Sequence, residues 1–295
     1  VALLGAYISR PVFDPTTLRR LLANTSDIKN GMISRGNATA LRLGEACLTA
    51  VGAYGHRLVG LEAYRQLFRM AEDFDGACDR LIEGMTRVSR RVWRTVPIVY
   101  AIGGDTAKGI WEEALSRLPL TCTRDAEGYT VTPVTREARA LCIPGEVNYC
   151  GEVFATPADG DFYPRARVIA SYLNSSYFWD EIRAKGGAYG GGITVTPHGV
   201  VAMSSYRDPR LAETYGAFER LPDWLEGHIP DGETLGSLQV STLGSAYFLP
   251  QSPLDEGMSA VVRYLLRKTV EDRRAEVAAI LDTRPEDFAR FASML

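Results

Sequence analysis

The sequence predicts an α+β fold of about two domains, with helices packed on one face of a mainly antiparallel sheet. A length of 295 residues suggests roughly two domains, and 46% apolar residues are enough for folded cores. Helical patterns alternate with paired strand patterns, an order that favours antiparallel sheets. Residues 119 to 140 show no clear period. We therefore place the domains at 1–120 and 141–295, joined by a linker at 121–140.

The first half is predicted to begin with a strand and to continue mainly as helices. Residues 2–8 form an apolar run typical of a strand, and Asp14-Pro15 supplies an N-cap and a first helical residue. We interpret residues 24–37, which are rich in Asn, Gly and Ser, as a loop. The later elements expected here are helices at 38–53, 59–72 and 76–92, a strand at 96–102 and a helix capped by Asp105.

A long helix and a hairpin are the clearest elements predicted in the second half. Alternation from Val147 to Val153 predicts a strand, and a helix of about 164–185 follows a turn. The hairpin strands are expected at 188–196 and 200–206, joined by Pro197-His198-Gly199. Further helix starts are predicted at Asp208-Pro209, at Ser252-Pro253-Leu254-Asp255 and at the capping box Thr283-Arg284-Pro285-Glu286.

Composition excludes several classes of partner. A net charge of −3 gives no basic field for nucleic acid, and the apolar runs fall far short of the ~20 residues of a membrane helix. Five cysteines without a C-x-x-C pair indicate reduced thiols of an intracellular compartment. They are Cys47, Cys78, Cys122, Cys142 and Cys150. Because the chain opens on Val1 within an apolar run, we expect it to be part of a longer polypeptide, from which a targeting segment was removed.

The sequence lacks the residues of a self-contained hydrolase. A zinc protease helix needs two histidines one turn apart with a carboxylate, whereas His56, His198 and His228 are far apart. We expect His198 in the hairpin turn and His228 at a helix end. No G-x-S-x-G elbow occurs, and no cysteine has an obvious histidine partner in sequence. The chain is therefore expected to bind no metal and to be inactive alone.

The most informative segment is 181–192, which reads Glu-Ile-Arg-Ala-Lys-Gly-Gly-Ala-Tyr-Gly-Gly-Gly. Its glycines do not form a phosphate loop, because a phosphate loop runs from strand through glycines to helix. Here a helix comes first and a strand follows. The glycines flank a guanidinium, Arg183, and a phenol, Tyr189, six residues apart. This arrangement suits a site that grips an extended peptide.

Each of these residues also has a structural interpretation. Gly186 occupies a C-cap position, where Arg183 and Lys185 would complement the negative end of the helix dipole. Tyr189 could be an amphipathic aromatic at the start of a strand. The three glycines at 190–192 remain unexplained, since glycine weakens a strand unless another backbone approaches closely. A peptide that adds to this sheet edge would supply such an approach.

Several motifs then point to a known family. The segments that carry the resemblance are Val147-Asn148-Tyr149, the run from Glu181 to Gly191, Ser205-Tyr206-Arg207-Asp208-Pro209 and Asp287-Phe288 with Phe291-Ala292. With these motifs in order, residues 141–295 resemble the pitrilysin/insulinase superfamily of zinc metallopeptidases, within it the presequence protease and falcilysin branch. Residues 1–120 are more loosely similar, through the Asn30-Gly31 loop, the helices after it and the strand at 96–102.

The resemblance implies a protease of two homologous halves that close around a peptide, of which this chain is the C-terminal half. It implies that 1–120 is the latter, incomplete part of a third domain and that 141–295 is a fourth domain of the same type. The zinc ligands, in an H-x-x-E-H motif with a distal Glu, would lie in the N-terminal half. Arg183 and Tyr189 match the family's catalytic Arg and Tyr. The substrate-binding positions implied are Asn148, Gly186, Gly187, Gly190 and Gly191.

The resemblance also implies a mechanism and a location. Zinc held by the other half would polarise the water and the peptide carbonyl, and the Tyr189 hydroxyl would donate to the oxyanion. Arg183 would add positive charge or position the substrate backbone. The substrates implied are short unstructured peptides in the mitochondrial matrix, or else in a plastid-type organelle or the cytoplasm. Two alternatives stay open: a non-catalytic, peptide-binding subunit of a processing peptidase, and an interaction module that meets a protein partner.

Overall fold

The computed structural model describes residues 2–93, 100, 102–119, 130–133, 140–157, 160–248 and 251–295. The chain divides into two compact units, each assembled from three stretches of sequence. Unit 1 comprises 1–28, 64–129 and 251–267, and unit 2 comprises 29–63, 130–250 and 268–295. The α+β class is confirmed, because helices pack on a three-stranded antiparallel sheet. The domain boundaries at 120 and 141 stay a prediction.

The regular elements described in unit 1 are all helices. Its helices are α1 (Ala2–Ser9), α2 (Pro15–Ala23), α7 (Phe74–Val92), α8 (Asp105–Ser116) and α12 (Pro253–Leu265), while α3 (Thr25–Ser34) and α6 (Leu61–Glu72) extend across the boundary between units. Leu18, Leu22 and Phe74 form its small buried cluster. Two predicted helix starts are confirmed. The Asp14 carboxylate accepts the Thr17 N–H at 2.7 Å, and Ser252 accepts the Asp255 N–H at 3.2 Å.

Three predictions for the first half are wrong, and one lies outside the described residues. Residues 2–8 belong to α1, because a short apolar run has no period that separates strand from helix. The loop predicted at 24–37 contains α3. Its Asn, Gly and Ser residues have low helix propensity, but propensity alone does not decide whether a segment is helical. Gly104, not Asp105, is the N-cap of α8. The strand predicted at 96–102 falls largely on residues that the structure does not describe.

Unit 2 holds the sheet. Its elements are α4 (Gly36–Leu48), α5 (Ala50–Val59), β1 (Gly151–Ala155), α9 (Phe162–Ser175), the π-helix η1 (Phe178–Ala184), β2 (Gly190–Thr196), β3 (Val200–Tyr206), α10 (Ala212–Gly227), α11 (Gly232–Leu243), the π-helix η2 (Gly244–Phe248), α13 (Val270–Leu281) and α14 (Pro285–Ala292). The helix predicted at 38–53 divides at Thr49, whose hydroxyl caps α5. The helix predicted at 164–185 divides into α9 and η1. The predicted C-terminal capping box is displaced by one residue, since the Arg284 N–H donates to Asp287.

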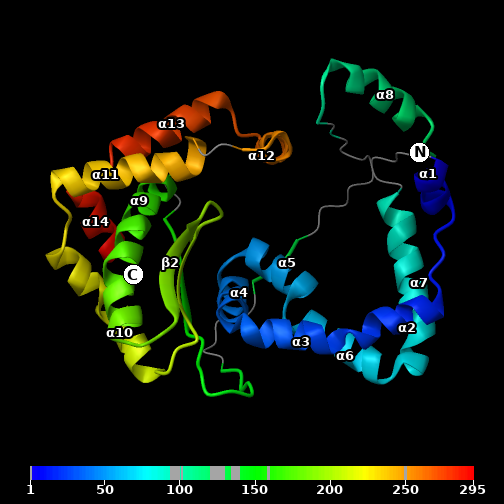
Figure 1. Cartoon of the computed structure of the whole chain (residues 1–295), viewed down its shortest axis with the longest axis horizontal. Coiled ribbons are helices and arrows are strands. Elements are labelled where there is room, and N and C mark those ends of the chain that lie inside the picture. Colours follow the sequence, from blue (N-terminus) through cyan, green and yellow to red (C-terminus); the bar gives the residue numbers. More distant parts are fainter. Residues whose placement is uncertain are drawn as a thin grey trace. The chain divides into compact units, whose positions relative to one another are not determined.

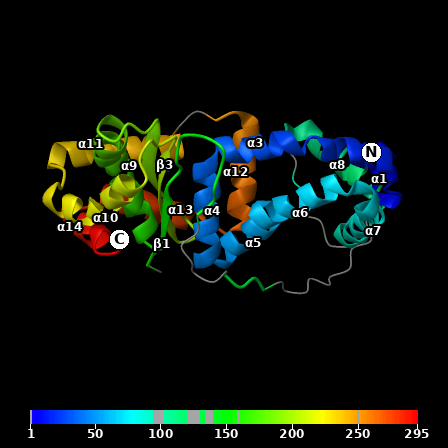
Figure 2. The ribbon, with the colours of Figure 1, turned by 90° about the horizontal axis from the view of Figure 1, so that it is seen from below.

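The sheet has the strand order β1-β3-β2 and is antiparallel throughout. The predicted hairpin is confirmed, with β2 and β3 joined by a turn in which Gly199 has a φ of 90°. The strand predicted from Val147 to Val153 begins later, at Gly151, and Asn148 forms only an isolated bridge to Asp208. The sheet lies between α9 on one side and α4 on the other (Figures 1 and 2).

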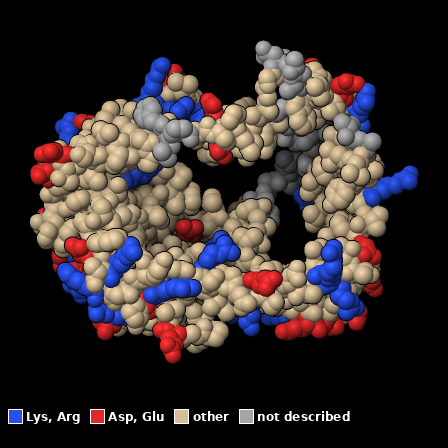
Figure 3. All heavy atoms as spheres, viewed as in Figure 1, with Lys and Arg blue, Asp and Glu red and all other residues tan. Residues whose placement is uncertain are grey.

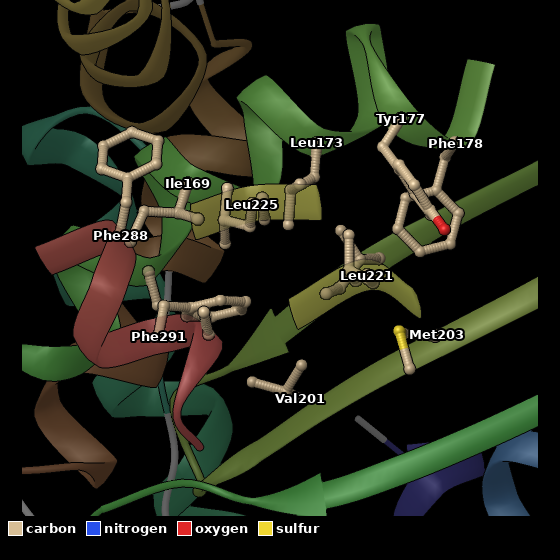
Figure 4. Packing of buried hydrophobic residues seen from close by; sticks show 14 of the residues in the cluster. Ile169, Leu173, Tyr177, Phe178, Val201, Met203, Leu221, Leu225, Phe288 and Phe291 are labelled. Atoms are coloured by element: carbon tan, nitrogen blue, oxygen red, sulfur yellow. The ribbon is translucent and has the colours of Figure 1, made fainter. Parts of the chain in front are cut away.

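The main core lies between the sheet and the helices α9, α10 and α14. In Figure 4, Val201 of β3 lies near Phe291 of α14, and Met203 of β3 lies near Leu221 of α10 and Phe178 of η1; all belong to one hydrophobic cluster. The largest fully buried rings are Phe178, Phe218, Phe288 and Phe291. Burying one side chain of this size stabilises the fold by about 1.5–3 kcal/mol. This core therefore fixes η1 and the hairpin.

An ion-pair network joins α9 to α14 and to the turn before it, and we expect its loss to be measurable. Arg165, only 17% exposed, contacts Asp282 at 3.1 Å and Asp287 at 3.0 Å. Hydrogen bonds from Arg284 and then Arg165 lower the pKa of Asp282, so the network persists at mildly acidic pH. Arg165→Met should lower the free energy of unfolding by about 1–2 kcal/mol in urea titrations. The exposed Arg274→Met serves as the control, and an equal loss there would contradict the prediction.

Candidate functional site

The glycine turn is built on a π-helix. In η1 the Lys185 N–H donates to the Asp180 carbonyl at 2.8 Å, a spacing of five residues. Such wide turns are rare and occur frequently at functional sites. The helix ends at Ala184 with Lys185 as its C-cap, so the C-cap predicted at Gly186 is wrong. The left-handed residue is Gly187, with a φ of 80°. Gly186 is required for another reason, because a Cβ there would lie 2.3 Å from the Ile182 carbonyl oxygen.

Arg183 projects from this helix into solvent. Its guanidinium carbon lies 4.4 Å from the centre of the Trp179 ring, one turn earlier. The neighbouring cation, Lys185, forms an ion pair with Glu181, whose hydrogen bond raises the pKa of the lysine. Within the part of the chain that the structure describes, no carboxylate lies within ion-pair distance of Arg183. The guanidinium is therefore oriented by an aromatic ring and is available to an outside acceptor.

Tyr189 follows the turn, is 70% exposed and stands at one end of a row of tyrosines. Its ring centre lies 5.9 Å from that of Tyr206, and Tyr206 lies 5.6 Å from Tyr149. We call Tyr149, Tyr189 and Tyr206 the tyrosine row. The row supports the Tyr189 ring from one side and leaves it accessible. Arg183 and Tyr189 thus lie on either side of the glycine turn, and no contact between their side chains is found among the described residues.

Packing within the chain explains two of the three strand glycines. A Cβ on Gly191 would lie 2.5 Å from Cγ2 of Ile182, and one on Gly192 would lie 2.7 Å from Oδ1 of Asn174. The Asn174 amide also donates to the Ile193 carbonyl at 2.9 Å and accepts the Ile193 N–H at 2.8 Å. The sequence suggested that another backbone approaches these glycines, but their nearest neighbours are side chains of η1 and α9. The Asn174 side chain therefore already occupies the backbone hydrogen-bonding groups of Ile193 at the edge of β2.

Asn148 has a structural task at the end of β3. Its backbone exchanges hydrogen bonds of 2.7 and 2.9 Å with Asp208, and its side chain donates to the Asp208 carbonyl. The Asp208 carboxylate is fully buried and accepts from the Arg210 N–H and the Thr214 hydroxyl. The helix start predicted at Asp208-Pro209 is wrong, because α10 begins at Ala212 after its N-cap Leu211. Substrate binding by Asn148, Gly186, Gly187, Gly190 and Gly191 stays a prediction.

Arg207 is a residue for which the sequence left several partners open. It is exposed and has a φ of 48°, a left-handed conformation unusual for a side chain of this size. Its guanidinium carbon lies 5.7 Å from the centre of the Tyr206 ring. It lines a recess of about 340 Å³ in unit 2. The lining residues are Asn30, Ile33, Ser34, Val147, Tyr149 and Arg207.

The described residues hold no cluster of three or more histidine, cysteine, aspartate or glutamate side chains that could bind a metal. His198 lies in the hairpin turn, and His228 is the C-cap of α10, stacked 4.4 Å from Trp224, both as predicted. Four cysteines are free thiols, and burial raises the pKa of Cys150; Cys122 lies outside the described residues. No described helix is long and apolar enough to cross a membrane.

Charged side chains of both signs are mixed on one face of the molecule. On the face shown in Figure 3, Lys and Arg are interspersed with Asp and Glu. This distribution agrees with the small net charge of −3.

Comparison with known proteins gives a consistent result. The family model described as PreP C-terminal domain matches residues 138–295. Presequence protease 1, chloroplastic/mitochondrial, of Arabidopsis thaliana is 28% identical over 282 residues, covering 91% of this chain and 25% of that protein. The mitochondrial presequence protease of Mus musculus is 31% identical over 140 residues, covering 47% and 13%. The chain thus spans a quarter or less of the length of these relatives.

A solved structure is also similar. A protease from Helicobacter pylori aligns with a TM-score of 0.48 and 14% sequence identity. The alignment covers 65% of this chain and 50% of that one.

Proposed function

The chain belongs to the PreP C-terminal domain family, and we propose from this premise that it forms the substrate-facing wall of a zinc metalloendopeptidase that degrades short unstructured peptides. The observation that carries the proposal is the pair Arg183 and Tyr189. Both side chains are solvent-exposed, and each rests on an aromatic ring beside a turn that glycine sterics fix. Fixed donors of this kind stabilise charge that develops on a substrate carbonyl.

In this proposal the two side chains have distinct tasks. The Tyr189 hydroxyl donates a hydrogen bond to the peptide carbonyl oxygen as that oxygen becomes negative. Arg183 supplies positive charge nearby or holds the substrate backbone. The Trp179 and Tyr206 rings limit the motion of these two groups, so little reorganisation accompanies the reaction.

Zinc and its ligands are assigned to another part of the protein. The described residues do not fit a metal, since they contain no cluster of three potential ligands. We therefore propose an N-terminal catalytic half as the partner, with the zinc site in that half. The names of the relatives support an organelle as the location, and we propose the mitochondrial matrix.

Reconstitution tests the proposal directly. The chain would be mixed with the separately produced N-terminal half and zinc, and cleavage of a fluorogenic peptide would be measured. We expect hydrolysis in the mixture and none with this chain alone. Peptide binding without hydrolysis in the mixture would contradict the catalytic proposal and favour a non-catalytic binding subunit. A stable complex that neither binds nor cleaves peptides would favour an interaction module.

A further inference from the structure

We propose that Arg207 and the recess beside it form a subsite for a carboxylate of the bound peptide. The proposal rests on the proposed function in one respect, namely that peptide runs along the face that carries Tyr189. It adds a preference for a carboxylate, which the Arg183 and Tyr189 pair does not give. The carboxylate is either the free C-terminus of the peptide or an Asp or Glu side chain.

The first observation is that the Arg207 guanidinium has no anionic partner. Among the described residues no carboxylate lies within ion-pair distance of it, and it donates no hydrogen bond to them. The carboxylate next in sequence, Asp208, is buried and is bound by Arg210 and Thr214. The Arg207 guanidinium lies over the Tyr206 ring, which orients the planar group without neutralising it.

The second observation is the recess itself. None of its lining residues is acidic, and three of them offer polar side chains beside the guanidinium: Asn30, Ser34 and Tyr149. Its volume of about 340 Å³ is that of a small ligand site and suits one or two side chains. The Ser34 and Tyr149 hydroxyls donate to the Gly31 and Ser34 carbonyls, so the donors left for a ligand are the Asn30 amide and the Arg207 guanidinium. A guanidinium beside an amide donor is the chemistry that binds a carboxylate. The other walls, Ile33 and Val147, are apolar and would cover the aliphatic part of the guest.

The third observation is the backbone that presents Arg207. Its φ of 48° is disfavoured for arginine, and the bridge between Asn148 and Asp208 holds the chain in this conformation. The Arg207 carbonyl accepts the Tyr189 N–H at 3.4 Å. The two residues are therefore cross-strand neighbours, whose Cβ atoms are typically roughly 5 Å apart. An extended peptide advances about 3.3 Å a residue. A carboxylate one to three residues from the carbonyl bound by Tyr189 would therefore reach Arg207.

Binding measurements on the whole chain test the subsite independently of hydrolysis. Four labelled peptides of one sequence would be compared by fluorescence anisotropy, with either Glu or Gln at one position and a free or an amidated C-terminus. Arg207→Gly removes the guanidinium and suits the left-handed backbone, so the fold is kept. We expect it to weaken binding of carboxylate-bearing peptides about tenfold and to leave the doubly neutral peptide within about twofold.

The peptide set also identifies the source of the carboxylate. If Arg207→Gly no longer weakens binding once the peptide C-terminus is amidated, the subsite binds the C-terminal carboxylate. If it no longer weakens binding once Glu is replaced by Gln, the subsite binds a side-chain carboxylate. Arg207→Lys should retain part of the preference. The control for Arg207→Gln is the same substitution at Arg210, which is exposed and lies three residues away. The Arg210→Gln variant should bind all four peptides like the original chain.

Three outcomes would overturn the subsite: equal weakening of all four peptides by Arg207→Gly, an equal effect of Arg210→Gln, or no binding of any peptide by the original chain. Failure here is distinct from failure of the proposed function. If the carboxylate preference is found but Tyr189→Phe leaves turnover unchanged, the subsite stands and Tyr189 has no catalytic role. If the reconstituted protease hydrolyses peptides but shows no carboxylate preference, the proposed function stands and the subsite does not.

Discussion

Tyr189→Phe is expected to lower kcat of the reconstituted protease by about 10²–10³-fold, the usual effect of removing one donor to an oxyanion. The substitution deletes a single hydroxyl from a ring that is 70% exposed. The contact of that ring with Tyr206 is made by its edge or face and does not need the hydroxyl. We therefore expect KM and the free energy of unfolding to change little, since only the transition state uses the lost hydrogen bond.

The matched control is Tyr264→Phe, which removes a hydroxyl from an exposed tyrosine of α12, outside the tyrosine row. Steady-state hydrolysis of one fluorogenic peptide by both variants gives the comparison. If kcat were unchanged in Tyr189→Phe, Tyr189 would have no part in the chemistry. If KM rose while kcat stayed constant, the hydroxyl would bind substrate and transition state equally, and its role would be substrate binding alone.

Sequence patterns predicted best where one local rule decides the structure. The hairpin at 190–206 and the caps Asp14 and Ser252 follow from alternation, turn chemistry and side-chain acceptors, each contained within a few residues. The errors arose where distant partners decide. Asp208 looks like an N-cap, but its carboxylate is bound to Thr214 and its backbone is paired with Asn148, 60 residues earlier. No local pattern contains that pairing.

The candidate site divides in the same way. The helix break after Arg183 follows from the glycines at 186 and 187, whereas the solvent exposure of Arg183 and Tyr189 comes from the structure. The π-helix and the left-handed Arg207 do not follow from composition, since neither has a sequence signal of its own. The glycines at 191 and 192 were interpreted as a sign that another backbone approaches, whereas the structure places the side chains of Ile182 and Asn174 there.

A pair of core substitutions separates the stability of unit 2 from the geometry of its site. Phe178 and Phe288 are both fully buried in the same hydrophobic cluster. Replacing either by Ala should lower the free energy of unfolding by about 3–5 kcal/mol, because each leaves a cavity the size of a ring. Urea titrations followed by circular dichroism would measure both losses, and a loss below about 1 kcal/mol would contradict the burial of that ring.

The two variants should differ in peptide binding, because the rings support different elements. Phe178 is the first residue of η1, the helix that carries Arg183 and positions the glycine turn, whereas Phe288 belongs to α14. A cavity under η1 lets that helix shift toward the core, and Arg183 moves with it. At a temperature where both variants remain folded, we expect only Phe178→Ala to weaken peptide binding. Equal weakening by Phe288→Ala would mean that the whole cluster, rather than η1 alone, holds the site in place.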